Sequence, residues 1–166
     1  MHRVLCGVLC ACIVALSPIV VMADPPTLPD SVDFRLDNHR WAHRLLFVFA
    51  SSDTSEGLAR QNEAFAGRDA GVRERDLLLL TVTGRDHGTH RTAPGADPRP
   101  LTKAAARRLR DRFDVAPDAS RVVLVGKDGT EKRRDAAPVP ARSVFDTIDA
   151  MPMRQREMQE EEGGGE

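Results

Sequence analysis

Hydrophobic residues gather in three short runs that contain no polar residue. They occupy residues 45–49, 77–80 and 122–125. Continuous apolar runs of this length are typical of strands covered on both faces, as in a parallel or mixed sheet between helices. We therefore predict that these segments form the buried strands of one sheet.

Two helical patterns separate the three runs. After the first run, Leu58, Phe65 and Val72 recur every seven residues. After the second, apolar residues recur every four residues, at Leu101, Ala105, Leu109 and Phe113. Both spacings place side chains on one face of an α-helix. Each pattern therefore predicts a helix that connects two strands, with the neighbouring arginines largely outside the apolar stripe.

The region after the third run predicts a hairpin and a last helix. Asp128–Gly129 favours a tight turn, and residues 130–134 would return as a charged edge strand. The following helix has Pro140 in its first turn, Pro152 at its stop and an apolar face formed by Val144, Phe145, Ile148 and Met151. The predicted class is α/β: an α/β/α layer with a mixed sheet and the element order βαβαββα, which is the order of the thioredoxin fold.

The N-terminus has the pattern of a secretory signal peptide. Arg3 supplies a positive start, residues 4–23 carry no charge, and Ala23 precedes Asp-Pro-Pro. An uncleaved anchor helix is the alternative, because twenty apolar residues can just span a bilayer. Pro18 and the proline-rich exit favour cleavage after Ala23. We expect an exported protein, periplasmic or secreted, with no membrane span after cleavage.

Composition divides the chain into four parts. Residues 1–23 are the expected signal peptide, and residues 24–35 form a proline-containing extended leader. Residues 36–158 carry the predicted domain, which is long enough for one hydrophobic core. Residues 159–166, rich in glutamate and glycine, are expected to form a disordered acidic tail.

All three cysteines lie within the first twelve positions. Cleavage after Ala23 would leave none, whereas a redox thioredoxin carries Cys-x-x-Cys directly after its first strand. Residues 51–55 read Ser-Ser-Asp-Thr-Ser instead, and hydroxyl groups cannot exchange disulfides. Dithiol oxidoreductase activity is therefore excluded for the mature chain. We interpret the loop as a helix cap, with a ligand site at Ser51 and Ser52 as the alternative.

Charge and aromatic content argue against nucleic acid as a partner. The net charge is -1, and the chain has one tryptophan and no tyrosine, so it offers neither a basic field nor a stacking platform. The tryptophan, Trp41, lies between His39 and His43. We interpret Trp41 as a packing residue and the two histidines as part of the entrance to the fold.

Several segments resemble one family, the domain of unknown function 4174. They are residues 40–41 and 44–49, Gln61, and residues 74–76, 124–129, 148–154 and 157–158. The resemblance covers about residues 35–158 and implies a thioredoxin-like fold. It also implies a small exported protein in bacteria, while a similar domain occurs in animal extracellular-matrix proteins, including sushi-repeat proteins. The family has no established catalytic residues, so the resemblance implies no activity.

Residues 86–90 read Asp-His-Gly-Thr-His and are the one cluster in the sequence that resembles a set of metal ligands. Two histidines and a carboxylate can hold zinc. The surrounding segment 84–100 contains three glycines and three prolines, which a mobile surface loop explains without a ligand. We therefore expect no cofactor and no metal, with a site at His87 and His90 as the alternative.

Two polar residues are further candidates for binding. Gln61 falls on the inward face of the first helix, and a buried amide needs a partner, either the loop after the first strand or a bound molecule. Arg154 pairs with Asp149 or reaches a partner. The candidate binding residues are thus Ser51, Ser52, Gln61 and Arg154.

Two functions remain in view. The first is an exported, non-redox thioredoxin-like domain that binds a protein or another envelope or extracellular component. The alternative is a hydrolase or metal-dependent enzyme that uses the loop of His87 and His90. The well-patterned fold and the missing thiols favour the first.

Overall fold

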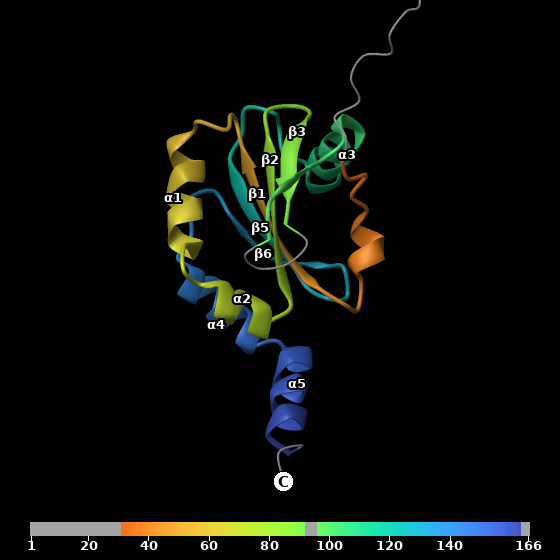
Figure 1. The fold of residues 1–166 in the computed structure, drawn as a ribbon, viewed down its shortest axis with the longest axis vertical. Helices are drawn as coiled ribbons and strands as arrows, with labels where there is room; N and C mark the ends of the chain where they lie inside the picture. The colour runs from red at the N-terminus through yellow and green to blue at the C-terminus, as the bar shows by residue number, and fades with distance from the viewer. Residues whose placement is uncertain (1–30, 92–95, 164–166) are drawn as a thin grey trace, which may run out of the picture.

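The structure is a computed structural model that describes residues 31–91 and 96–163. The predicted signal peptide, most of the leader and the last three residues of the predicted tail lie outside this part of the chain. A six-stranded sheet has the order β4-β3-β2-β1-β5-β6, with helices on both faces (Figure 1). The strands are β1 (Arg44–Ala50), β2 (Leu77–Thr83), β3 (His87–His90), β4 (Arg99–Pro100), β5 (Arg121–Val125) and β6 (Glu131–Asp135).

One short 3-10 helix and five α-helices accompany these strands in the described residues. They are η1 (Leu36–His39), α1 (Glu56–Phe65), α2 (Asp69–Glu74), α3 (Lys103–Phe113), α4 (Ala141–Asp149) and α5 (Pro152–Gly163). β1 and β2 run parallel, and the other pairs of neighbouring strands are antiparallel. The order β1-α1-β2-α3-β5-β6-α4 confirms the predicted α/β class. None of the described helices is long and apolar enough to span a bilayer.

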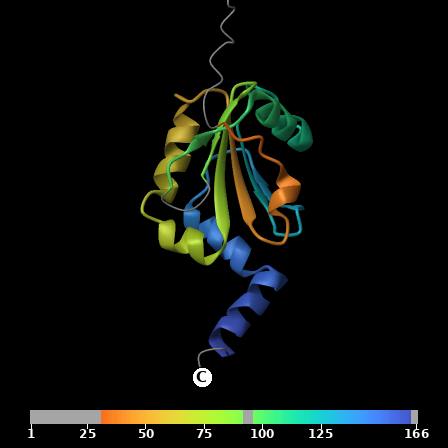
Figure 2. The same cartoon turned by 45° about the vertical axis from the view of Figure 1, so that its right-hand side comes forward.

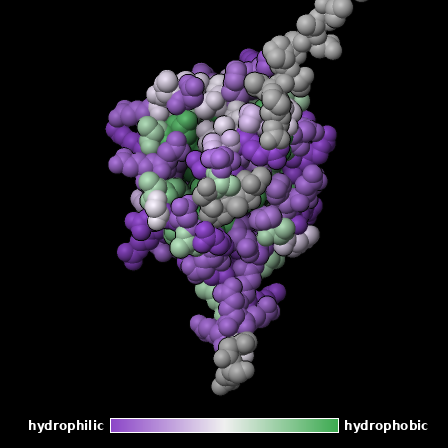
Figure 3. All heavy atoms as spheres, viewed as in Figure 1, coloured by the Kyte–Doolittle hydropathy of each residue, from purple (hydrophilic) through white to green (hydrophobic). Residues whose placement is uncertain are grey.

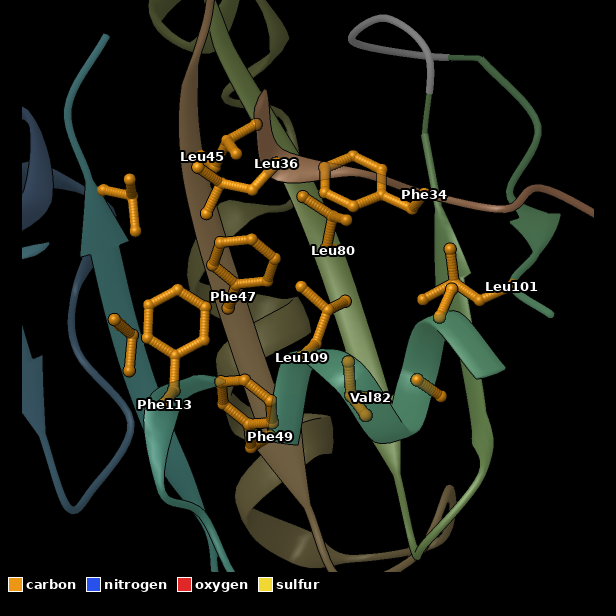
Figure 4. Close-up of a cluster of buried hydrophobic side chains, with 14 of the residues drawn as sticks. Phe34, Leu36, Leu45, Phe47, Phe49, Leu80, Val82, Leu101, Leu109 and Phe113 are labelled. Carbon is orange, nitrogen blue, oxygen red and sulfur yellow. The ribbon is translucent and has the colours of Figure 1, made fainter. Parts of the chain in front are cut away.

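The central strand β1 is buried along its whole length. Successive side chains of a strand point to opposite faces, so Leu45, Phe47 and Phe49 pack toward α3 (Figure 4). The alternate residue Leu46 packs with α2 and α4 on the other face. Figure 2 shows α1 and α3 on opposite sides of the sheet. Burial on both faces explains why the run contains no polar residue.

Three helical predictions need correction. The seven-residue pattern from Leu58 to Val72 forms two helices, because Gly67 adopts a positive φ of 69° between α1 and α2. Pro152 begins α5, where a first-turn proline loses no helical hydrogen bond. Because α5 continues to Gly163, residues 159–163 of the expected disordered tail are helical.

The segment predicted as a surface loop contains two strands. Gly84 turns the chain with a φ of 54°, and β3 then pairs antiparallel with β2 and with β4. The end of the expected leader also belongs to the fold. Val32 forms a parallel bridge with Leu101, and Phe34 is buried in the core beside α3.

Ion pairs attach α5 to the domain. Glu157 accepts hydrogen bonds from Arg44, the almost fully buried first residue of β1, at 2.9 Å and from Lys127 at 2.8 Å. The buried Arg154 pairs with Glu74 at 3.0 Å and lies 3.7 Å from Asp149. The expected pair of Arg154 with Asp149 is therefore present, within a larger network.

We predict that Glu157→Gln lowers the free energy of unfolding by about 2 kcal/mol, because Arg44 and Lys127 lose their shared anionic acceptor. Urea unfolding at neutral pH measures this loss. Glu160→Gln on the exposed side of the same helix is the control, and we expect it to change the free energy by less than about 0.5 kcal/mol. Equal effects of the two substitutions would contradict the prediction.

The pH dependence should follow the same network. Burial by itself raises the pKa of Glu157, but hydrogen bonds from Lys127 and Arg44 outweigh it and hold the pKa below its ordinary value of 4.5. A lowered pKa stabilises the folded state above the ordinary value, and the contribution is lost as pH falls through the folded pKa. The difference between wild type and Glu157→Gln should therefore shrink below pH 4.5.

Candidate functional site

A groove of about 810 Å³ lies on the face of the sheet beside α1. On this face, α1 packs on β1 and α2 packs on β2, while β3 carries no described helix. Figure 3 looks at the molecule from the direction of Figure 1 and shows hydrophobic residues between hydrophilic ones. The groove is therefore a stretch of sheet surface with α1 as its wall.

Apolar and hydroxyl side chains form the floor of the groove. Thr81 of β2 stands opposite Thr89 of β3, and Thr83 stands opposite His87, so the four share one face. Leu79 continues the same row toward α2. The floor therefore changes from apolar to hydroxyl-rich along β2.

The rim of the groove carries both signs of charge. Asp53, Asp69 and Asp86 line it together with Arg91 and Lys103. Hydrogen bonding to Arg107, with burial acting against it, lowers the pKa of Asp86, so this carboxylate is ionised at neutral pH. A rim of mixed sign does not select a strongly charged ligand.

Gln61 lines the groove, but its amide is already engaged. The side chain is buried, its Nε2 donates to the Val139 carbonyl at 3.0 Å, and its Oε1 accepts from the Val139 N–H at 2.8 Å. The partner is thus neither the loop after β1 nor a bound molecule, but the backbone just before α4. Gln61 thus joins α1 to the segment before α4, and both of its polar atoms already take part in a structural hydrogen bond.

The loop after β1 does not cap α1 as predicted. Ser55 holds the N-cap position, yet its side chain makes no capping hydrogen bond, and its Oγ is buried without a partner. Ser51 is exposed, and the Ser52 hydroxyl lies 3.3 Å from that of Thr54. Neither Ser51 nor Ser52 lines the groove. Asp53, from the same loop, does.

Sequence reasoning missed the residue that holds the base of this loop. The buried Arg110 of α3 donates to the carbonyl oxygens of Ala50 at 2.8 Å, Val82 at 3.2 Å and Ala116 at 2.6 Å. The expectation that the arginines of α3 lie largely outside its apolar stripe does not hold for Arg110. The spacing contained the signal, because Arg110 lies three residues before Phe113, on the inward face of the helix.

His87 and His90 do not form a common site. They lie on opposite faces of β3: the side chain of His87 is 75% exposed beside the groove, whereas His90 is 4% exposed and packs against Phe34. The geometry therefore gives no support to the alternative of a site shared by His87 and His90. In residues 31–91 and 96–163, no group of three His, Cys, Asp or Glu side chains is arranged to hold a metal ion.

Trp41 does not pack into the fold as predicted. Its side chain is 64% exposed, and its backbone has a φ of 66°, which is unusual for a bulky residue. The histidines on either side of it approach each other, with 5.5 Å between the ring centroids of His39 and His43. The inward residues of this segment are thus the histidines.

We predict that Gln61→Ala lowers the free energy of unfolding by about 2–4 kcal/mol, because it leaves two buried backbone groups of Val139 without partners. Asn62→Ala removes an exposed amide from the next position and is the control. Urea unfolding of both variants tests the difference. A loss of less than about 0.5 kcal/mol for Gln61→Ala would show that the pair of hydrogen bonds is unimportant.

Comparison with known proteins agrees with this architecture. The family model described as "Domain of unknown function (DUF4174)" matches residues 35–157. Coiled-coil domain-containing protein 80 of Danio rerio is 26% identical over 140 residues, which cover 78% of this chain but only 16% of that protein. The solved structure of thioredoxin peroxidase I of Plasmodium yoelii superposes with a TM-score of 0.53 at 15% identity, covering 73% of this chain and 79% of that one. The chain therefore belongs to the family of domain of unknown function 4174, and its fold is thioredoxin-like.

Proposed function

We propose that the protein is an exported, non-redox thioredoxin-like domain that binds an extended segment of a partner protein in the groove beside α1. The observation that carries this proposal is the open sheet surface of β2 and β3. Its volume of about 810 Å³ lies within the range of known ligand sites.

The shape of the floor supports an extended polypeptide as the occupant. Leu79, Thr81 and Thr83 face the groove at every second residue, which is also the spacing of side chains along one face of an extended chain. Threonine hydroxyls can donate and accept hydrogen bonds. The mixed charges of the rim and the net charge of -1 fit a partner without strong charge.

The chemistry of the loop after β1 supports binding without thiol exchange. Residues 51–55 contain hydroxyl groups and one carboxylate, and Arg110 holds the carbonyl end of β1 in place. Export is supported by the signal-like pattern of residues 1–23. The first 23 residues lie outside the described part of the chain.

We predict that Ala66→Arg abolishes capture of the partner. Ala66 is an exposed residue at the end of α1 that lines the groove, so a long side chain there would occupy the binding space. Ala59→Arg places the same side chain at an exposed position of α1 that does not line the groove. Affinity capture from the native host, with quantitative mass spectrometry, compares the two variants with wild type.

A protein retained by wild type and Ala59→Arg but reduced at least tenfold by Ala66→Arg would support the groove as the site. Peptides that tile this protein would then identify the bound segment. Retention of every partner by Ala66→Arg would refute binding in the groove. Urea unfolding of both variants ensures that the comparison uses equally folded proteins.

We predict that the exported protein begins at Asp24. Mass spectrometry of the protein recovered from the native host should show the loss of residues 1–23. Ala23→Arg places a bulky charge at the expected cleavage position and should leave the precursor uncut. Recovery of a soluble protein that retains Met1 would contradict export by cleavage.

A further inference from the structure

Residues 31–43, which we call the strap, lie on the face of the sheet opposite the groove. Figure 4 shows Phe34 and Leu36 of the strap among the core side chains that also pack against α3. Polar contacts attach the strap near its two ends. Val32 donates to the Pro100 carbonyl at 2.8 Å and accepts from the Thr102 N–H at 3.0 Å. Arg108 pairs with Asp33 and donates to the Phe34 carbonyl, and the Trp41 N–H donates to the Lys127 carbonyl at 2.6 Å.

Three histidines meet where the strap contacts β3. The ring centroid of His39 lies 4.6 Å from Phe34, in a stacked arrangement, and 5.5 Å from His43. From β3, the ring of His90 lies 5.7 Å from His39 and 5.1 Å from Phe34. Two half-buried imidazoles of the strap and one buried imidazole of the sheet therefore share a single cluster.

The cluster lacks the hydrogen bonds that buried imidazoles ordinarily make. Nδ1 of His39, Nδ1 of His43 and both ring nitrogens of His90 are buried without a partner. A neutral imidazole carries one donor and one acceptor, and leaving a buried polar group unpaired costs about 1–3 kcal/mol. This cost disfavours the attached strap even before any proton is added.

The surrounding charges oppose protonation. The charged and titratable groups that act on His90 are His39 and His43 from the strap and Arg99 from β4, and no described carboxylate is among them. Arg108 of α3 pairs with Asp33 at the start of the strap. Burial first, and these neighbours second, lower the pKa of His90 to about 4, and burial also lowers the pKa of His39.

We propose that the strap is an acid-released latch: protonation of His39 and His90, in the cluster that they form with His43, detaches residues 31–43 while the sheet and its helices stay folded. The detached strap withdraws Phe34 and Leu36 and uncovers the apolar surface beneath them. Release is local because Val32 forms an isolated bridge with Leu101: detachment breaks the hydrogen bonds of Val32 with Pro100 and Thr102 but none of the ladders within the six-stranded sheet. This latch does not depend on the function proposed for the groove.

The sign of the pH dependence follows from linkage. A histidine whose pKa is lowered by attachment stabilises the attached state fully above its ordinary pKa of 6.5 and loses that contribution as pH falls toward 4. For His90 alone, a change from 6.5 to about 4 lowers the attachment equilibrium up to roughly 300-fold below pH 4. Attachment of the strap should therefore weaken between pH 6.5 and 4.

Trp41 lies within the strap and is the single tryptophan of the chain, so its fluorescence anisotropy reports the strap alone. We expect the anisotropy to fall between pH 6.5 and 4 while the far-UV circular dichroism is retained. Hydrogen-exchange protection factors of residues 31–43 should fall over the same range. His90→Phe and His90→Leu cannot take up the proton and should shift the midpoint downward by at least one pH unit.

His87→Phe is the matched control, because His87 lies on the same strand but on its exposed face. It should follow the wild-type curve. The proposal is overturned if both His90 variants release the strap at the wild-type pH, or if the circular dichroism is lost together with the anisotropy. Stoichiometric binding of Zn²⁺ by wild type at pH 7 that is absent in both His90 variants would also overturn it, in favour of a metal centre.

Discussion

The buried guanidinium of Arg110 is the constraint on which one end of the domain depends. Its hydrogen bonds join the carbonyl ends of β1 and β2 to the residues before β5. These three segments lie far from one another in the sequence. Backbone carbonyls at strand ends need donors when they are buried, and one arginine supplies several in a fixed fork. Arg110 therefore fixes the strand ends at which the loop after β1 and the hydroxyl-rich end of the groove begin.

At the opposite end of β1 a carboxylate pairs with a buried guanidinium. Arg44 is almost fully buried, and it pairs with Glu157, which also accepts from Lys127. Because α5 has no apolar face and its one buried residue is Arg154, this helix is attached by ion pairs and not by hydrophobic packing. Removal of one member leaves a buried charge unpaired. The network therefore stabilises the position of α5 as a set of ion pairs that must all be present.

The hydrophobic pattern of the sequence predicted the buried strands of the fold. Strands β1, β2 and β5 are buried on both faces, so their apolar runs were sufficient evidence. β3 was missed because its residues 87–90 lie among glycines and prolines and pair through a neighbour that sequence does not identify. For the candidate site, Gln61 was correctly placed inward, but its partner Val139 is 78 residues away. No local spacing could reveal that contact.

The two faces of β3 lie in two different environments, the groove and the contact with the strap. His87 and Thr89 face the groove, whereas His90 faces the strap. The ladder with β2 fixes this alternation: Leu80 stands opposite His90, and Thr81 opposite Thr89. Because the sheet stays folded, release of the strap would uncover the face of β3 that carries His90 and leave Thr89 on the floor of the groove. β3 is thus the described strand whose two faces serve the strap and the groove.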